Sequence, residues 1–305
     1  MNVQKIDTFA GHRDCVYALA PGPAPGQFFS SGADGLVVSW QLQRPDLGQL
    51  LARVPASVYA LAYDPDRNHL WIGQNFDGVH LVDPVTKAEV HSVRITNSAI
   101  FDIKFLNNLA LVALSDGVLV VMDTAGLPDE APVVRKHLKA SESNARAIAV
   151  HPEQPVFAVG YSDAIIRIFD AETLTLRQVL TGHTNSVFTV QYSPDGRFLL
   201  SGGRDAHLKV WDVAAGYVPI HDIPAHLYAI NHLAYSPDGT LFATGSMDKA
   251  VKIWDAATFR LLKVIDRARH AGHGTSVNRL WWSDFRNQLV SCSDDRLISV
   301  WEVGR

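Results

Sequence analysis

Apolar residues recur along this chain in short bursts separated by polar turns. Residues 183–222 show the pattern in full, with the bursts SVFTVQY, RFLLSGG, HLKVWDV and YVPIHDI. Each burst is rich in Val, Ile, Phe and Tyr and is bounded by turn residues, which predicts four antiparallel β-strands. No stretch sustains a period of 3.6 residues, so we expect helices to be nearly absent.

The turns between the bursts have matching chemistry. SPDG stands at 193–196 and again at 236–239, while DPDRN at 64–68 and HPEQP at 151–155 hold the equivalent place. Pro at the second position of a type I turn, followed by Gly, suits a tight connection between strands.

A signature with fixed spacing divides the chain into repeats. In SGGRDAHLKVWDV, Asp205 precedes Trp211 by six residues, and His183 stands 22 residues before the Asp; three more segments repeat this spacing. Weaker copies fill the gaps between them. The residues that occupy the position of Trp211 in the seven repeats are Trp40, Val82, Met122, Phe169, Trp211, Trp254 and Trp301. Successive members of this series are 42, 40, 47, 42, 43 and 47 residues apart. Seven such units predict a repeat architecture.

The sequence resembles the WD-repeat β-propeller family over its whole length. The resemblance rests on the Asp of each turn and on a set of dipeptides: Gly-His at 11–12, 182–183 and 272–273, Ala-His at 225–226, Trp-Asp at 211–212 and 254–255, and Trp-Glu at 301–302. It implies an all-β fold, a seven-bladed β-propeller of four-stranded antiparallel blades around a channel. Repeats two, three and four lack the His, and Val82, Met122 and Phe169 replace the Trp.

The two ends of the chain predict how the ring closes. The last repeat stops at Arg305, just after its third strand, while VQKIDTF at 3–9 precedes Gly11-His12 as LRQVL at 176–180 precedes Gly182-His183. We therefore expect residues 3–9 to join the last blade as its outer strand, which protects an open sheet edge. Residues 1–305 are then a single domain.

Four sets of polar residues contain the residue types of a hydrolase triad. These quartets are His12, Ser30, Asp34 and Trp40; His183, Ser201, Asp205 and Trp211; His226, Thr244, Asp248 and Trp254; and His273, Ser291, Asp295 and Trp301. Acyl transfer needs one such arrangement rather than four. In WD-repeat proteins the set is a buried hydrogen-bond network, and buried polar atoms need partners. We interpret the quartets as structural.

Function is therefore expected on exposed loops held by the ring. In the family, the wide face carries the loops that enter each innermost strand and the turns before the third strand. Counting five residues past each His, or its counterpart, predicts the channel mouth, formed by Tyr17, Tyr59, Phe101, Arg146, Phe188, Asn231 and Asn278. The residues before the turn Asp extend this surface with Phe76, Arg204, Met247 and Asp294, although repeat two is one residue out of register at Phe76.

The channel-mouth positions allow two interpretations. Aromatic residues and Arg are enriched at interaction hot spots, which favours a partner-binding surface. Alternatively, the rings pack on one another and partly plug the channel.

Two insertions lengthen the regular unit. TAGLPDEAP at 124–132 is expected on the narrow face, exposed to solvent. DRARHAGHG at 266–274 is expected on the wide face, where Arg267, Arg269 and His270 either contact a carboxylate or phosphate group or are simply a polar surface loop.

Composition narrows the class of partner. The formal net charge is −4 and no block of Lys and Arg occurs, which argues against nucleic acid or an anionic membrane. Two cysteines and the absence of an apolar leader favour a cytoplasmic location. We expect no cofactor and no metal: His69, His80 and His91 are eleven residues apart, which places them on different strands.

The leading hypothesis is a non-catalytic scaffold or adaptor that binds a protein or peptide partner on its wide face, as a monomer or a subunit of a complex. Two alternatives remain open. One is a small-ligand-binding or hydrolytic propeller that uses the channel mouth, and the other is a structural subunit of a larger assembly.

Overall fold

Seven four-stranded antiparallel sheets form the fold in the computed structural model, which describes residues 1–304 apart from the side chain of Asp46. From the axis outward, blades 1 to 4 are β2 (Val16–Pro21), β3 (Gln27–Gly32), β4 (Leu36–Gln41), β5 (Arg44–Arg53); β6 (Val58–Asp64), β7 (His69–Gln74), β8 (Gly78–Val82), β9 (Glu89–Arg94); β10 (Ile100–Leu106), β11 (Leu109–Leu114), β12 (Val118–Asp123), β13 (Val133–Lys139); and β14 (Ala145–Val150), β15 (Val156–Tyr161), β16 (Ile166–Asp170), β17 (Leu176–Leu180). Blades 5 to 7 are β18 (Val187–Tyr192), β19 (Phe198–Gly203), β20 (His207–Asp212), β21 (Val218–Pro224); β22 (Ile230–Tyr235), β23 (Leu241–Ser246), β24 (Val251–Asp255), β25 (Leu261–Ile265); and β26 (Val277–Trp282), β27 (Gln288–Ser293), β28 (Leu297–Gly304), β1 (Asn2–Ala10).

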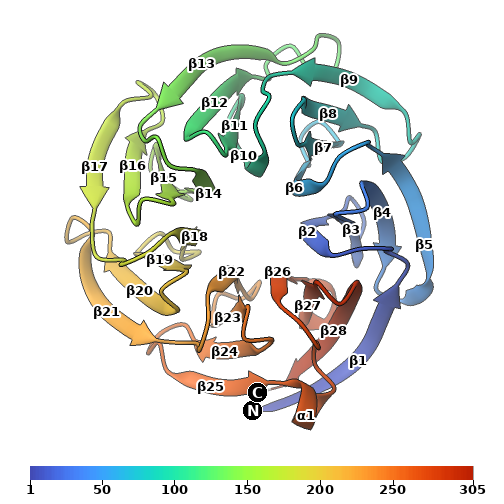
Figure 1. Ribbon diagram of the computed structural model, residues 1–305, viewed down its shortest axis with the longest axis vertical. Helices are drawn as coiled ribbons and strands as arrows, with labels where there is room; N and C mark the ends of the chain where they lie inside the picture. The colour runs from blue at the N-terminus through green and yellow to red at the C-terminus, as the bar shows by residue number, and fades with distance from the viewer. Residues whose placement is uncertain (305) are drawn as a thin grey trace.

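The blades stand radially around a central channel, as Figure 1 shows in a view down the ring axis. The first strand of each blade lies nearest the axis and the fourth lies at the circumference. The predicted seven-bladed propeller is therefore confirmed.

Burial decreases from the middle of each blade to its outer edge. All six residues of β7, β15, β23 and β27 are buried, because both faces of a second strand pack against neighbouring blades. The outer strand β21 is exposed at nearly every position. This explains why the second and third strands are richer in apolar residues than the outer strands.

The apolar core is divided among the spaces between blades. Within residues 1–304, buried apolar side chains form seven clusters, one at each of the seven contacts between neighbouring blades. Between blades 5 and 6, for example, Ile230 and Leu233 pack against Leu200 and Leu208. The blades approach closely here: a Cβ on Gly202 would lie only 2.9 Å from the side chain of Ile230.

The N-terminal strand closes the ring. β1 pairs antiparallel with β28, from Asn2 opposite Gly304 to Ala10 opposite Leu297, with a bulge between Lys5 and Asp7. The outer strand of blade 7 thus comes from the opposite end of the chain, as the sequence predicted, and the two termini lie together in Figure 1.

Helices are short and few in the described part of the chain. They are α1 (Arg267–His270), whose first turn is capped by the Asp266 side chain accepting from the Arg269 N–H, and a 3-10 turn over Phe285–Asn287.

The loop at residues 124–132 is exposed at most of its positions but is buried at Leu127. Leu127 is buried and packs with Trp71, Leu81 and Met122 between blades 2 and 3, so this part of the loop is not solvated. Burial of this Leu side chain favours a loop conformation that folds back onto the ring.

Candidate functional site

Each innermost strand carries a β-bulge at the position predicted to face the channel mouth. In blade 1 the register between β2 and β3 shifts between Val16 and Ala18, which leaves Tyr17 without a partner, and the six other innermost strands shift in the same way. A bulge bends the strand and redirects a side chain. One side chain from every blade is therefore turned toward the same end of the channel.

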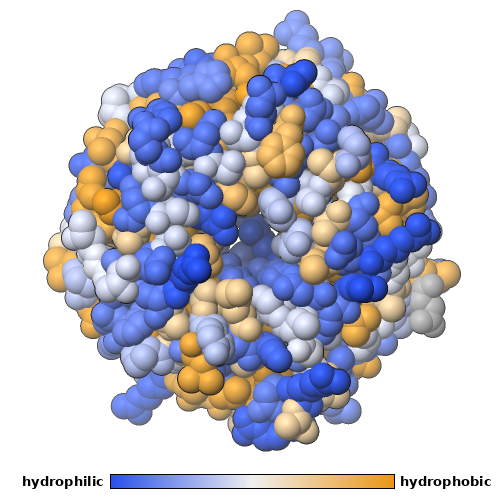
Figure 2. Space-filling model, viewed as in Figure 1, coloured by the Kyte–Doolittle hydropathy of each residue, from blue (hydrophilic) through white to orange (hydrophobic). Residues whose placement is uncertain are grey.

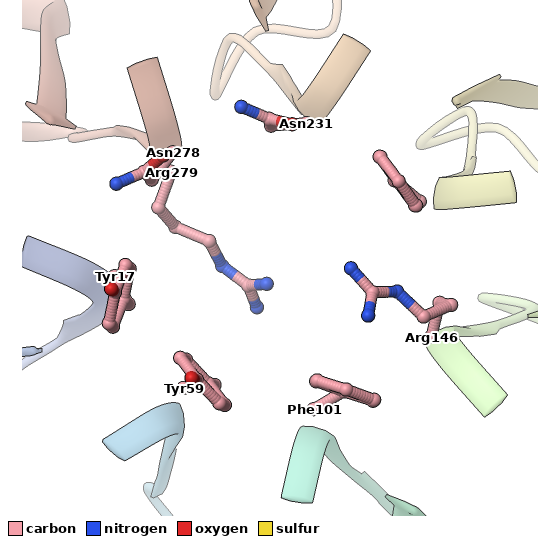
Figure 3. Close-up of a pocket in the computed structure, with 8 residues that line it drawn as sticks. Tyr17, Tyr59, Phe101, Arg146, Asn231, Asn278 and Arg279 are labelled. Atoms are coloured by element: carbon pink, nitrogen blue, oxygen red, sulfur yellow. The ribbon is translucent and has the colours of Figure 1, made fainter. Parts of the chain in front are cut away.

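These side chains surround a cavity of about 340 Å³. Figure 3 shows them pointing inward from their strands. The lining contains all seven predicted channel-mouth residues and one further residue, Arg279; the eight, which we call the channel-mouth site, are Tyr17, Tyr59, Phe101, Arg146, Phe188, Asn231, Asn278 and Arg279.

Five of these residues form a continuous arc of side chains in contact. The ring centroids of Tyr17 and Tyr59 are 4.8 Å apart, and those of Tyr59 and Phe101 are 5.8 Å apart. The Arg146 guanidinium lies 4.2 Å from the Phe101 ring centroid and 4.6 Å from that of Phe188. The rings do pack on one another, as one interpretation expected, yet they leave the cavity open between them.

The two amide side chains connect neighbouring blades. Asn231 of blade 6 donates from Nδ2 to the Val277 carbonyl at 2.8 Å, and Asn278 of blade 7 donates to the Val16 carbonyl of blade 1 at 2.9 Å. A second bond from Asn278 reaches the carboxylate of Asp294 at 2.7 Å. These amides hold the lining in place, so its contact surface is left mainly to the aromatic rings and the two arginines.

A charged cluster lies in the channel beside the mouth and was not predicted from the sequence. Arg279 of blade 7 donates from Nη2 to the buried carboxylate of Asp102 in blade 3 at 3.2 Å, and Lys104 Nζ lies 3.6 Å from the same carboxylate. The other Asp102 oxygen accepts from the Ile148 N–H of blade 4 at 2.9 Å. Figure 2 shows the face hollowed at its centre, with hydrophilic atoms at the bottom of the hollow.

The pKa values in this cluster reflect its crowding with positive charge. The Asp102 carboxylate raises the pKa of Lys104, but burial and the neighbouring Arg279 outweigh it and lower that pKa. Burial, together with Arg279 and Lys104, holds the pKa of His232 well below its usual value, so this ring is neutral. The sequence did contain a signal, because Asp102, His232 and Arg279 each directly follow a predicted channel-mouth residue.

Each quartet is joined by hydrogen bonds. In blade 5, the His183 Nδ1 lies 2.8 Å from Asp205 and its Nε2 lies 2.8 Å from the Ser201 hydroxyl, which also accepts from the Trp211 indole N–H at 2.9 Å. His183 and Asp205 side chains are only 1% and 6% exposed. The same contacts join the quartets that begin at His12, His226 and His273.

Comparison with protein-family models agrees with this geometry. The model described as "WD domain, G-beta repeat" matches residues 3–41, 174–212, 217–255 and 266–302. The chain belongs to the WD-repeat family. Every matched segment of this WD-repeat chain contains a complete quartet, whereas blades 2 to 4, which lack the His and Trp, lie mostly outside the matched segments.

Individual WD-repeat relatives are distant. Striatin-4 of Homo sapiens is 25% identical over 249 residues, which cover 74% of this chain and 32% of striatin-4. The WD repeat-containing protein SL1-17 of Schistosoma mansoni is 26% identical over 212 residues, or 70% of this chain and 55% of SL1-17. The nuclear distribution protein PAC1 of Ajellomyces capsulatus is 34% identical over 110 residues, covering 35% of this chain and 24% of PAC1. The chain thus spans less than a third of PAC1 and about a third of striatin-4.

Two WD-repeat blades without a quartet keep the turn carboxylate and change its donor. In blade 4, Ser141 stands 22 residues before Asp163 and donates to it at 2.6 Å, while Arg167 forms an ion pair with the same carboxylate at 2.8 Å. In blade 3, Ser98 donates to Asp116 at 3.1 Å. A hydroxyl therefore replaces the imidazole as donor to the turn carboxylate.

Blade 2 differs at the turn that contributes to the wide face. The strand register places Phe76, not Asp77, in the middle of the turn, where blade 1 has Asp34. The residue preceding it, Asn75, is buried. Phe76 is 63% exposed with a positive φ of 67°, a conformation that is costly for an aromatic residue. The register offset noted in the sequence therefore pushes a large apolar ring into solvent.

The remaining predicted wide-face residues lie outside the cavity lining. Arg204 is exposed, Met247 is 53% exposed, and Asp294 accepts the bond from Asn278 described above. The structure adds Leu227, which is 85% exposed, and Tyr228, which is 64% exposed. These two residues belong to the loop entering blade 6, and the Met247 N–H donates to the carbonyl of the next residue in that loop, Ala229. Sequence reasoning missed them because it singled out one residue per loop.

The loop before blade 7 is organised by an internal ion pair. Arg269 donates to the Asp266 carboxylate from its backbone N–H at 2.8 Å and from Nη2 at 2.5 Å. This pairing lowers the pKa of Asp266. The Arg269 charge is thus already matched within the loop.

Two kinds of feature are absent from the described residues: a metal-ligand cluster and a membrane-spanning helix. Residues 1–304 contain no group of three or more His, Cys, Asp or Glu side chains placed to hold a metal ion. His69, His80 and His91 lie on β7, β8 and β9, three different strands as expected. Within the same residues, no helix has the length and apolar character needed to cross a membrane.

Proposed function

We propose that this WD-repeat propeller is a non-catalytic scaffold or adaptor that binds a protein or peptide segment on its wide face, around the channel-mouth site. The observation that carries the proposal is the convergence of one side chain from every blade on a single cavity of about 340 Å³. Strand bulges on a rigid ring hold these side chains, so the surface is organised before a partner arrives. Preorganisation of this kind lowers the entropic cost of binding.

The chemistry of the site supports recognition. Four of its side chains are aromatic and two are arginines, the residue types that dominate interaction hot spots. Exposed Leu227, Tyr228 and Met247 lie at blade 6, and exposed Phe76 lies at blade 2. Apolar side chains clustered among polar neighbours are typical of surfaces that a partner covers.

The location of the Ser, His and Asp groups supports a non-catalytic role. In blade 5, Ser201 and His183 are buried between strands, and the Ser201 oxygen is occupied by the Trp211 indole. A nucleophilic hydroxyl must instead meet its substrate in an open site. Cys15 and Cys292 are unpaired thiols, which supports a cytoplasmic location.

Affinity purification tests the binding surface. The wild-type protein is compared with the four-ring variant Tyr17→Ala, Tyr59→Ala, Phe101→Ala, Phe188→Ala. The matched control replaces four exposed apolar residues of the outer strands, Leu176→Ala, Val179→Ala, Ile220→Ala and Leu262→Ala. We expect partners recovered with the wild type and with the outer-strand variant to be lost from the four-ring variant. Recovery of the same partners by a folded four-ring variant would contradict the proposal.

A further inference from the structure

Arg146 is a half-buried cation without a counter-ion. Within residues 1–304 its guanidinium has the Phe101 and Phe188 rings as neighbours, and it has no hydrogen-bond or ion-pair partner. Burial lowers the pKa of this guanidinium, which shows that its charge is partly removed from water. A desolvated cation with unused N–H donors costs free energy that an anion would offset.

The two rings flank the guanidinium. Its central carbon lies 4.2 Å from the Phe101 ring centroid and 4.6 Å from that of Phe188, and within residues 1–304 its N–H donors make no hydrogen bond, so they are available to a ligand. Figure 3 shows Arg146 extending into the cavity toward the axis, with Arg279 reaching toward it from the other side. The hydrogen bond of Arg279 to Asp102 comes from Nη2, one of its donor groups.

The charges around the cavity are unbalanced. Arg146, Arg279 and Lys104 carry three positive charges, and one buried carboxylate, Asp102, lies among them. Asp294 is the acidic group at the rim, and its carboxylate accepts from Asn278. The chain as a whole has a formal net charge of −4, so this local excess of positive charge is opposite to its overall charge.

We propose that the channel-mouth site binds an oxyanion carried by a peptide, either a carboxylate or a phosphate, held between Arg146 and Arg279. Guanidinium groups bind both oxyanions through paired N–H donors. The arc formed by Tyr17, Tyr59 and Phe101 lies beside this position and contacts the residues that flank the acidic group. The inference rests on the proposed function and specifies the chemistry of the partner.

An oriented peptide library tests the inference with the full chain. Peptides share a random background and differ at one fixed central residue, which is Glu, phosphoserine, Gln, Ser or Lys, and retention on the immobilised protein is measured for each set. We expect Glu or phosphoserine peptides to be retained about tenfold more strongly than the Gln and Ser sets. The stronger of the two acidic sets identifies the source of the oxyanion.

Substitutions then assign the selectivity to Arg146. Arg146→Gln should abolish the preference for acidic peptides, and Arg146→Lys should reduce it because Lys keeps the charge and loses the paired donors. Arg135→Gln, at an exposed position on the outer strand β13, should behave as the wild type. Thermal unfolding of each variant separates loss of selectivity from loss of fold.

The outcomes distinguish this inference from the function on which it rests. The inference is overturned if the wild type selects neutral or basic peptides, or if Arg146→Gln keeps the wild-type preference for acidic peptides. Either result counts against the inference even if the four-ring variant loses peptide binding. If the wild type retains no peptide set more strongly than the four-ring variant does, both the inference and the proposed function fail. The wild-type library result decides the question of charge even if Arg146→Gln does not fold.

Discussion

Replacing Asp205 by Ala should destabilise the propeller, because this carboxylate joins the loop before β18 to the turn before β20. Asp205 accepts three hydrogen bonds, from His183 Nδ1 at 2.8 Å, from the Thr184 N–H at 3.1 Å and from the His207 N–H at 3.2 Å. The substitution removes all three and leaves a buried imidazole without its acceptor. It therefore tests whether the quartets brace the blades.

The magnitude follows from the structure in two ways. Three hydrogen bonds at about 1 kcal/mol each give a loss of about 3 kcal/mol in the free energy of unfolding. Burial opposes ionisation of Asp205, but the bonds with His183 and with backbone N–H groups outweigh it, so the pKa of Asp205 falls from 3.8 to about 2. A depression of this size corresponds to about 2–3 kcal/mol at neutral pH. Both figures describe the same hydrogen bonds, made by a carboxylate that is only 6% exposed.

The pH dependence has a definite sign. The pKa of Asp205 is lower in the folded protein than in the unfolded chain, so its contribution to stability is present above the unfolded value of 3.8 and is lost as the pH falls through about 2. Near pH 3 roughly half of the contribution should remain. The difference in stability between wild type and Asp205→Ala should therefore shrink as the pH falls from 5 toward 2.

Urea denaturation at a series of pH values between about 2.5 and 7 measures both effects. Asp212→Ala is the matched control, since this nearby carboxylate accepts one bond, from the Ala215 N–H in an exposed turn at 3.0 Å, and should cost less than about 1 kcal/mol. An Asp205→Ala protein as stable as the wild type at pH 7, or a stability difference that grows on acidification, would refute the account of the quartets.

Two further predictions concern the ring. Removing residues 2–10 exposes the edge of β28 and should cause the protein to aggregate, as measured by size-exclusion chromatography with light scattering. A truncated protein with the same size and the same melting temperature as the wild type would argue against closure by β1. Arg279→Gln removes the ion pair with the buried Asp102 across the channel and should lower the free energy of unfolding by about 1–3 kcal/mol, as measured by urea denaturation. The control Arg135→Gln, at an exposed position, should have little effect on that free energy. Equal stability of these two variants would show that the cross-channel pair contributes nothing.

The architecture was predictable because its determinants are local. The spacing of His183, Asp205 and Trp211 reflects one chain turning through a single blade, and it recurs wherever a blade repeats. The channel-mouth residues could be found by counting for the same reason: each innermost strand has its bulge at the same place, so position within a repeat predicts position in space.

The remaining features depend on contacts between distant segments. Arg279 and Asp102 are 177 residues apart and belong to blades on different parts of the ring, so no spacing within a repeat predicts their ion pair. The Phe76 offset follows from a turn that departs from the repeat, and the burial of Leu127 follows from packing against blade 2. In each case the repeat pattern is broken, and the tertiary environment decides the outcome.

The seam of the ring has a mechanical consequence. Because β1 and β28 run antiparallel with Asn2 opposite Gly304, the chain ends emerge side by side at the same end of the seam. Tension that pulls the two ends apart would load the terminal residue pair first and unzip the seam one pair after another, rather than shear all pairs at once. A propeller tethered by both ends would therefore open first at blade 7.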